Sequence, residues 1–139
     1  MEFQNNHRCF VCGQDNPDGL HLDFEPEGRA GVRTTCVIPE RFQGFAGIAH
    51  GGILATILDE CMVNTVWLRG VAAVTARFEV RLRRPVRLGA RVTFRAEVRR
   101  ESAKGFEVSS YAELDDGTVV AEGYGVLVKV GGTATRILP

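Results

Sequence analysis

The feature that most constrains the fold is one apolar stretch, residues 51–68, which reads GGILATILDECMVNTVWL. It is nearly long enough to cross a bilayer, but two adjacent carboxylates, Asp59 and Glu60, occupy its middle, and charge is costly in lipid. We therefore expect no membrane span. A helix that is apolar nearly all round must be wrapped by the rest of the chain. It would be about 27 Å long, and Gly70 is a suitable stop.

Much of the remaining sequence alternates with period two, as strands with one buried face do. In residues 74–84, Phe78 falls on the apolar phase, whereas Thr75 falls on the polar phase and could face a cleft. Tight turns such as the one at residues 115–117 favour antiparallel pairing. The fold class is therefore α+β, with a curled sheet around the helix. The expected strands are residues 20–25, 30–38, 74–84, 91–100, 106–114 and 118–130.

Length and charge limit the remaining possibilities. The 139 residues suffice for one domain, and 17 basic residues balance 17 acidic ones. That balance argues against a chain whose whole surface binds nucleic acid or membrane headgroups. The first residues carry neither a basic cluster nor an apolar run, so we expect a cytoplasmic protein with reduced cysteines. We expect an N-terminal segment (1–18) packed on the sheet, a domain (19–130) and a loosely held tail (131–139).

The helix is expected to begin at His50-Gly51-Gly52. The two glycines leave backbone N–H groups open, and the helix dipole adds partial positive charge there. Such a position suits a carbonyl oxygen that becomes an oxyanion. The alternative is an ordinary glycine-rich helix start with His50 as its cap.

The two carboxylates in the helix are the second candidate site. A buried carboxylate is costly unless it is paired, hydrated or used. Asp59 or Glu60 could act as a nucleophile or general base in hydrolysis, or both could face a solvated gap.

His50 and Asp59 are nine residues apart, which places them on opposite sides of a regular helix with about 13.5 Å of axial rise. They cannot form a hydrogen-bonded pair within one chain. If both serve one site, the second must come from another copy of the chain, so such a site requires a dimer.

The segments HGGILATILDE and VTARFEVRLRRPVRLG resemble the hotdog-fold thioesterases of the phenylacetate-degradation type. The resemblance covers residues 19–130. It implies a hotdog fold, in which a curved antiparallel sheet of about six strands wraps one long central helix and two subunits join their sheets edge to edge. It also implies hydrolysis of acyl-CoA thioesters without a metal or cofactor, by a homodimer that assembles further into a homotetramer.

The resemblance also implies roles for individual residues. Asp59 would activate water or attack the thioester carbon, and the Gly51 N–H would polarise the thioester carbonyl. His50 would position the thioester, and Thr75 would help to orient the water. In this scheme Asp59 of one chain meets His50 and Gly51 of the other.

Three further residues are expected to contact substrate: Gly52, Gln43 and Glu60. Many members of the family have Asn or Gln about six residues before the histidine, where this chain has Gly44. Gln43, its neighbour, is the candidate substitute. Glu60 lies about 100° around the helix from Asp59 and is the weaker candidate carboxylate.

The N-terminal segment contains a C-x2-C pair, Cys9 and Cys12. One interpretation is structural, a turn that lays the N-terminus across the sheet. A second is a zinc site completed by His7 and His21, and a third is a redox pair. Related thioesterases carry a similar opening, which favours the structural role, and we expect no metal.

Acyl-CoA hydrolysis is the expected activity. A non-catalytic acyl-CoA-binding hotdog module is the alternative, and a hydratase is disfavoured because it needs Asp and His close in one chain. The basic cluster around Pro85 is either a solvated strand face or a contact for CoA phosphates; its members are Arg81, Arg83, Arg84 and Arg87. Candidates for lining an acyl tunnel are Phe42, Phe45, Ile53, Met62 and Phe78.

Overall fold

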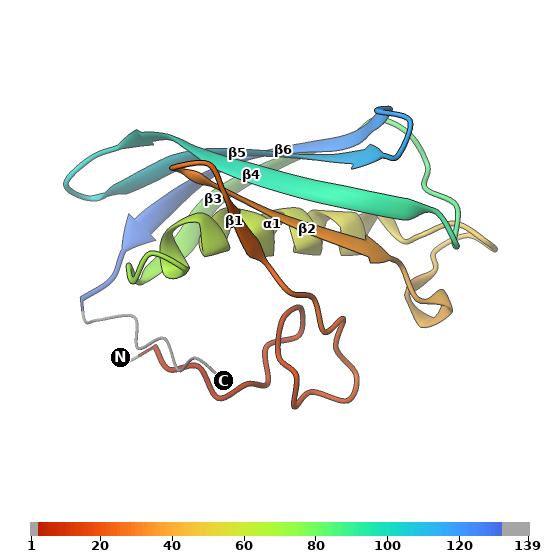
Figure 1. Cartoon of the computed structure of the whole chain (residues 1–139), viewed down its shortest axis with the longest axis horizontal. Helices are drawn as coiled ribbons and strands as arrows, with labels where there is room; N and C mark the ends of the chain where they lie inside the picture. The colour runs from red at the N-terminus through yellow and green to blue at the C-terminus, as the bar shows by residue number, and fades with distance from the viewer. Residues whose placement is uncertain (1–2, 132–139) are drawn as a thin grey trace.

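A computed structural model describes residues 3–131, in which one long helix, α1 (Gly51–Trp67), lies under an antiparallel sheet (Figure 1). The sheet has six strands in the order β1-β2-β4-β5-β6-β3, so the strands at its two edges are β1 and β3. This confirms the expected α+β hotdog architecture. The strands are β1 (Glu25–Glu27), β2 (Gly31–Val37), β3 (Ala73–Leu82), β4 (Arg91–Glu101), β5 (Gly105–Leu114) and β6 (Val119–Lys129), and a 3-10 turn η1 spans Glu40–Phe42.

The helix ends where the sequence predicted. Its N-cap is His50, and the chain leaves the last turn through Gly70, which has a φ of +83°. The N–H of Val71 then donates to the carbonyl of Val66 at 3.1 Å. A left-handed glycine with this bond satisfies the last carbonyls of a helix and reverses the chain toward β3.

The sheet approaches α1 closely because two inward-facing residues of β6 are glycines. A Cβ atom at Gly125 would lie 2.8 Å from Cε of Met62, and one at Gly123 would lie 3.7 Å from Cβ of Leu58. Both Met62 and Leu58 are fully buried. The core therefore sits between the inner face of the sheet and the upper face of the helix.

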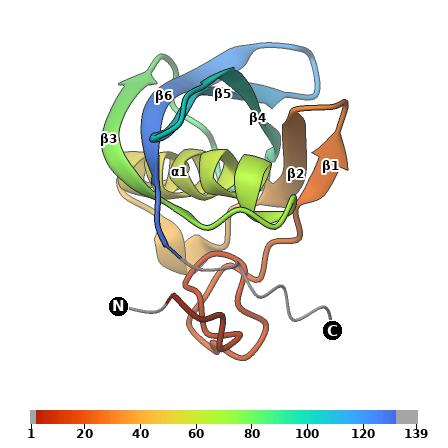
Figure 2. The ribbon, with the colours of Figure 1, turned by 90° about the vertical axis from the view of Figure 1, so that its left-hand side faces the viewer.

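The other side of α1 is covered by the N-terminal segment, as both ribbon views show (Figures 1 and 2). We expected residues 1–18 to pack on the sheet; the described part of this segment, residues 3–18, lies on the helix side, where Cys9 and Cys12 contact Glu60 of α1. Val11 is 3% exposed and joins the core from this side. A helix that is apolar all round needs cover on both faces, and one sheet shields only one of them.

The strand expected at residues 20–25 was wrong, since only Glu25–Glu27 pairs with β2. The predicted alternation of buried and exposed side chains is present, because Leu20 and Leu22 are both buried. Their N–H groups donate to the carbonyls of Phe10 and Val11, each at 2.9 Å, and not to a strand. Periodicity therefore identified the buried face but not the backbone partner.

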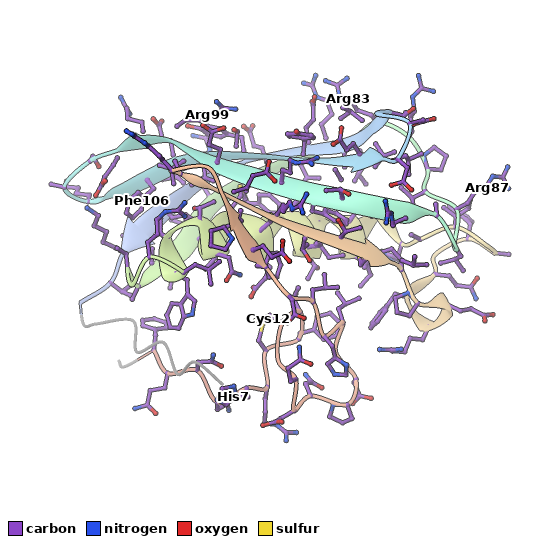
Figure 3. All side chains as sticks on the ribbon, in the orientation of Figure 1. His7, Cys12, Arg83, Arg87, Arg99 and Phe106 are labelled. Carbon is purple, nitrogen blue, oxygen red and sulfur yellow. The ribbon has the colours of Figure 1, made fainter. Side chains whose placement is uncertain are left out.

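The outer face of the sheet carries several cross-strand ion pairs. Arg95 pairs with Glu27 and Glu113, and Arg83 pairs with Glu122 across strands. Figure 3 shows Arg83 and Arg99 on this face, pointing away from the helix. These pairs place arginines and carboxylates side by side on the solvent-facing side of the sheet. Within residues 3–131, no helix has the length and apolar character needed to cross a membrane.

Candidate active site

Asp59, in the middle of α1, meets Thr75 of β3. The hydroxyl of Thr75 donates to Oδ1 of Asp59 at 2.7 Å, and both side chains are half-buried. This contact joins the two predicted residues that are sixteen positions apart in the chain.

A β-bulge turns Thr75 toward the helix. The register of β3 against β6 shifts between Thr75 and Arg77, with Thr75 opposite Leu127 and Phe78 opposite Gly125. Leu127 and Gly125 both face the core, so Thr75 and Phe78 share the inner face although regular alternation would separate them. The expectation that Thr75 lies on the polar phase was therefore wrong.

The pair lies next to an unpaired sheet edge. Among the described residues β3 pairs only with β6, so its other edge has no partner strand. Leu82, near the end of β3, is 52% exposed and also lies against Gly51 at the helix start. Both parts of the candidate site thus border the same edge strand.

At the helix start, His50 caps α1 through its own side chain. Nδ1 of His50 accepts from the N–H of Gly52 at 2.9 Å. This bond requires an unprotonated Nδ1 and so selects the tautomer with the proton on Nε2. It also engages the Gly52 N–H, which we had expected to be open to substrate. The Gly51 N–H has no hydrogen-bond partner within the part of the chain that the structure describes.

The loop before the helix fixes the position of His50. Oε1 of Gln43 accepts from the N–H of Gly47 at 3.0 Å, and the N–H of His50 donates to the carbonyl of Phe42 at 3.0 Å. Gly44 packs so closely that a Cβ there would lie 3.3 Å from Cα of His50. The amide oxygen of Gln43 is thus used within the loop, and Gly44 leaves room for the histidine.

The structure does not bring His50 and Asp59 together in one chain. Helix α1 is continuous from Gly51 to Trp67, so the His50–Asp59 separation stays at about 13.5 Å along the axis. The two groups of predicted residues, His50 with Gly51 and Asp59 with Thr75, therefore lie apart within one chain.

Glu60 points elsewhere. Its Oε1 accepts from the thiols of Cys9 at 3.4 Å and Cys12 at 3.2 Å, and Nδ2 of Asn64 lies 3.4 Å away. Burial raises the pKa of Glu60 to about 7. Glu60 therefore faces the N-terminal segment and not the surroundings of Asp59. Sequence reasoning missed this cluster, although the C-x2-C-G motif and the spare carboxylate were its signals.

The four cysteines differ in environment. The hydrogen bond from Cys12 lowers the pKa of Cys9, and the same bond, with burial, raises that of Cys12. Burial raises the pKa of Cys36 to about 11 and also raises that of Cys61. Of these thiols, Cys9 most readily forms a thiolate.

A cavity of about 500 Å³ opens beside Glu60, between the N-terminal segment and the second half of α1. The proposed tunnel residues do not line it: Met62 is fully buried in the core, and Phe42 packs edge-on against Phe10 at 5.7 Å. Phe45 is 87% exposed in the loop before the helix. The cavity is lined by Phe3, Gln4, Asn5, Asn6, Arg8, Cys9, Cys12, Glu60, Val63, Asn64, Trp67, Ala72, Ala73 and Val130.

Comparison with known proteins gives a family match. A sequence profile described as the thioesterase superfamily matches residues 46–121, more than half of the chain. This span contains His50, Gly51, Asp59 and Thr75 but neither Gln43 nor the two N-terminal cysteines.

A curated relative is the acyl-coenzyme A thioesterase THEM4 of Bos taurus, 29% identical over 101 residues, which cover 70% of this chain and 41% of THEM4. The chain thus spans less than half the length of that relative.

Solved structures share the fold. The PaaI protein of the E. coli phenylacetic acid degradation operon has a TM-score of 0.76 and 22% identity, over 82% of this chain and 83% of PaaI. The smu.793 protein of Streptococcus mutans, solved bound to acetyl CoA, has a TM-score of 0.74 and 18% identity, over 79% of this chain and 89% of that one.

Proposed function

Because the chain belongs to the thioesterase superfamily, we propose that it hydrolyses acyl-CoA thioesters to a carboxylic acid and CoA. The observation that carries the proposal is the hydrogen bond from Thr75 to Asp59 in the middle of the mostly apolar helix α1. A carboxylate held there by a hydroxyl has a defined orientation, as a general base or nucleophile needs.

In the simplest scheme Asp59 acts as a base. It takes a proton from water, whose oxygen bonds to the thioester carbon while negative charge develops on the carbonyl oxygen. The C–S bond then breaks, and the proton passes from Asp59 to the departing CoA sulfur. Direct attack by Asp59 on the thioester carbon, followed by hydrolysis of the acyl-enzyme, is the second scheme that this geometry allows.

The oxyanion would be stabilised by the start of α1. The Gly51 N–H is available there, and the positive end of the helix dipole adds to its effect. The His50 tautomer with its proton on Nε2 offers a second donor.

The two halves of the site would meet in a homodimer. The edge of β3 is ten residues long and unpaired among the described residues, and antiparallel pairing of two such edges would join the sheets. Asp59 and Thr75 of one subunit would then face the helix start of the other. Assembly of such dimers into a homotetramer remains a prediction.

A bound acyl-CoA has precedent in the Streptococcus mutans protein of similar fold, which was solved with acetyl CoA. In this chain Arg81, Arg84 and Arg87 are exposed near the end of β3 and could contact CoA phosphates. Arg87 projects from the end of the molecule where the helix begins (Figure 3). Arg83 is paired with Glu122 and is the weaker candidate.

The proposal is tested by measuring release of free thiol from a panel of acyl-CoA substrates. We expect turnover by the native chain, loss of turnover in Asp59→Asn, and native turnover in Asp15→Asn, which changes an exposed carboxylate in the N-terminal segment. Native turnover in Asp59→Asn would refute the role of this residue. Tight acyl-CoA binding without thiol release would favour a non-catalytic binding module.

A further inference from the structure

Three potential metal ligands from distant parts of the chain converge beneath α1. Sγ of Cys9, Sγ of Cys12 and a carboxylate oxygen of Glu60 all lie within 4.8 Å of one another. We propose that these three side chains bind a zinc ion, which ties the N-terminal segment to the central helix and keeps its fourth coordination position toward the adjoining cavity. The inference does not depend on the proposed hydrolase activity.

The turn that carries the cysteines is built to present two sulfurs together. The N–H of Val11 donates to Sγ of Cys9 at 3.4 Å, and the N–H of Gly13 donates to the carbonyl of Cys9 at 2.9 Å. A Cβ at Gly13 would lie 2.3 Å from the Cys9 nitrogen, so only glycine allows this turn. Backbone N–H groups directed at sulfur stabilise the thiolate that a metal requires.

The distances suit a tetrahedral ion. With a Zn–S bond of about 2.3 Å and a Zn–O bond of about 2.0 Å, tetrahedral coordination places sulfur and oxygen about 3.5 Å apart. The Glu60 oxygen lies 3.4 Å from the Cys9 sulfur and 3.2 Å from the Cys12 sulfur. The two sulfurs lie within 4.8 Å of one another, so the three atoms are close enough to bind one zinc ion.

The charge of the cluster also calls for a cation. Two thiol groups and a carboxyl group face one another in a half-buried position, and a cation bound between them would compensate the charge that they carry when ionised. Within residues 3–131 no Lys, Arg or His forms a salt bridge with Glu60. Nδ2 of Asn64 donates to the backbone carbonyl of Glu60 at 2.9 Å and lies 3.4 Å from its carboxylate, where it can also support the orientation of that side chain.

The donor set favours zinc among common metals. Two thiolates select against Mg²⁺ and Ca²⁺, which prefer oxygen ligands, whereas zinc accepts sulfur and carboxylate together. Neither His7 nor His21 belongs to the cluster, and Nε2 of His21 instead contacts the carbonyl of Asn16. Three protein ligands leave one position for water, on the side of the cavity of about 500 Å³ that Cys9, Cys12 and Glu60 help to line.

The test measures metal content and not activity. The full-length protein is reduced, loaded with Zn²⁺, desalted and analysed by mass spectrometry for zinc per chain. We expect one zinc per chain in the native protein and in Cys36→Ser, a control at a thiol outside the cluster. Cys9→Ser and Cys12→Ser should lose the metal, and Glu60→Gln should bind it at least about tenfold more weakly.

A second measurement uses the native sequence alone. Co²⁺ in place of Zn²⁺ should give an intense thiolate-to-metal charge-transfer band together with the visible bands of tetrahedral cobalt. No retained zinc and no such spectrum, or a Cys9–Cys12 disulfide in place of metal, would overturn the proposal. Native zinc affinity in Glu60→Gln would overturn the part assigned to Glu60.

Discussion

Asp59 and Glu60 are neighbours in the sequence, yet they belong to two different regions of the molecule. About 100° of helical rotation separates them. Asp59 accepts a hydrogen bond from the hydroxyl of Thr75, which lies on the edge strand β3. Glu60 accepts hydrogen bonds from two thiols of the N-terminal segment. The chemistry of a carboxylate on a buried helix is thus set by the segment that covers its face, and two adjacent acids can serve unrelated purposes.

The largest expected effect comes from exchanging each acid for its amide. Asp59→Asn should lower kcat/KM by about a thousandfold and leave zinc content unchanged, because the base is lost and the metal ligands remain. Glu60→Gln should weaken zinc binding and change kcat/KM by less than about threefold, since Glu60 does not face the Asp59–Thr75 pair. Steady-state thiol release and zinc analysis on both variants check this. Equal loss of turnover in both variants would show that Asp59 and Glu60 do not have separate roles.

The next effect tests whether the Asp59 half of the site needs a second chain. We expect homodimers of Asp59→Asn and of His50→Asn to be inactive; asparagine is chosen at position 50 because it retains N-capping. A heterodimer of the two variants, isolated through two different affinity tags, contains one complete site of two. It should therefore show about half of the native turnover. A heterodimer as inactive as its parents would place the whole site within one chain.

A smaller effect is expected from Thr75→Val, which keeps the side-chain shape and removes the hydroxyl from Asp59. Loss of a hydrogen bond to a charged group should lower kcat about tenfold to a hundredfold. Thr75→Ser should restore most of the rate. Thr93→Val is the matched control, because its hydroxyl contacts that of Thr35 on the exposed side of the sheet, away from Asp59. A native kcat in Thr75→Val would show that the hydroxyl has no role in the mechanism.

The smallest effect is on stability and concerns the Glu60 region. Zinc at about a hundredfold above its Kd should stabilise the folded state by about 2.7 kcal/mol, so a chelator should lower Tm by roughly 8 °C. In Cys12→Ser the chelator should have no effect. Differential scanning calorimetry with and without chelator checks both. An unchanged native Tm would indicate that no metal links the N-terminal segment to the helix.

Several features of this fold could be predicted from local sequence. The helix extent, the four strands after it and the opposed placement of His50 and Asp59 all follow from periodicity and from the rotation per residue. The absence of a strand at residues 20–25 could not be predicted from local sequence. The backbone N–H groups of Leu20 and Leu22 bond to Phe10 and Val11, which are ten or more residues away.

The sequence by itself determined that two carboxylates lie in the middle of a helix that must be enclosed, and that one chain cannot join His50 to Asp59. Only the tertiary structure decided which acid meets which partner. The bulge after Thr75 turns that hydroxyl inward to Asp59, and the N-terminal segment brings Cys9 and Cys12 to Glu60. Both contacts depend on where distant backbone segments pack, so the sequence could offer the residues but not show which of them meet.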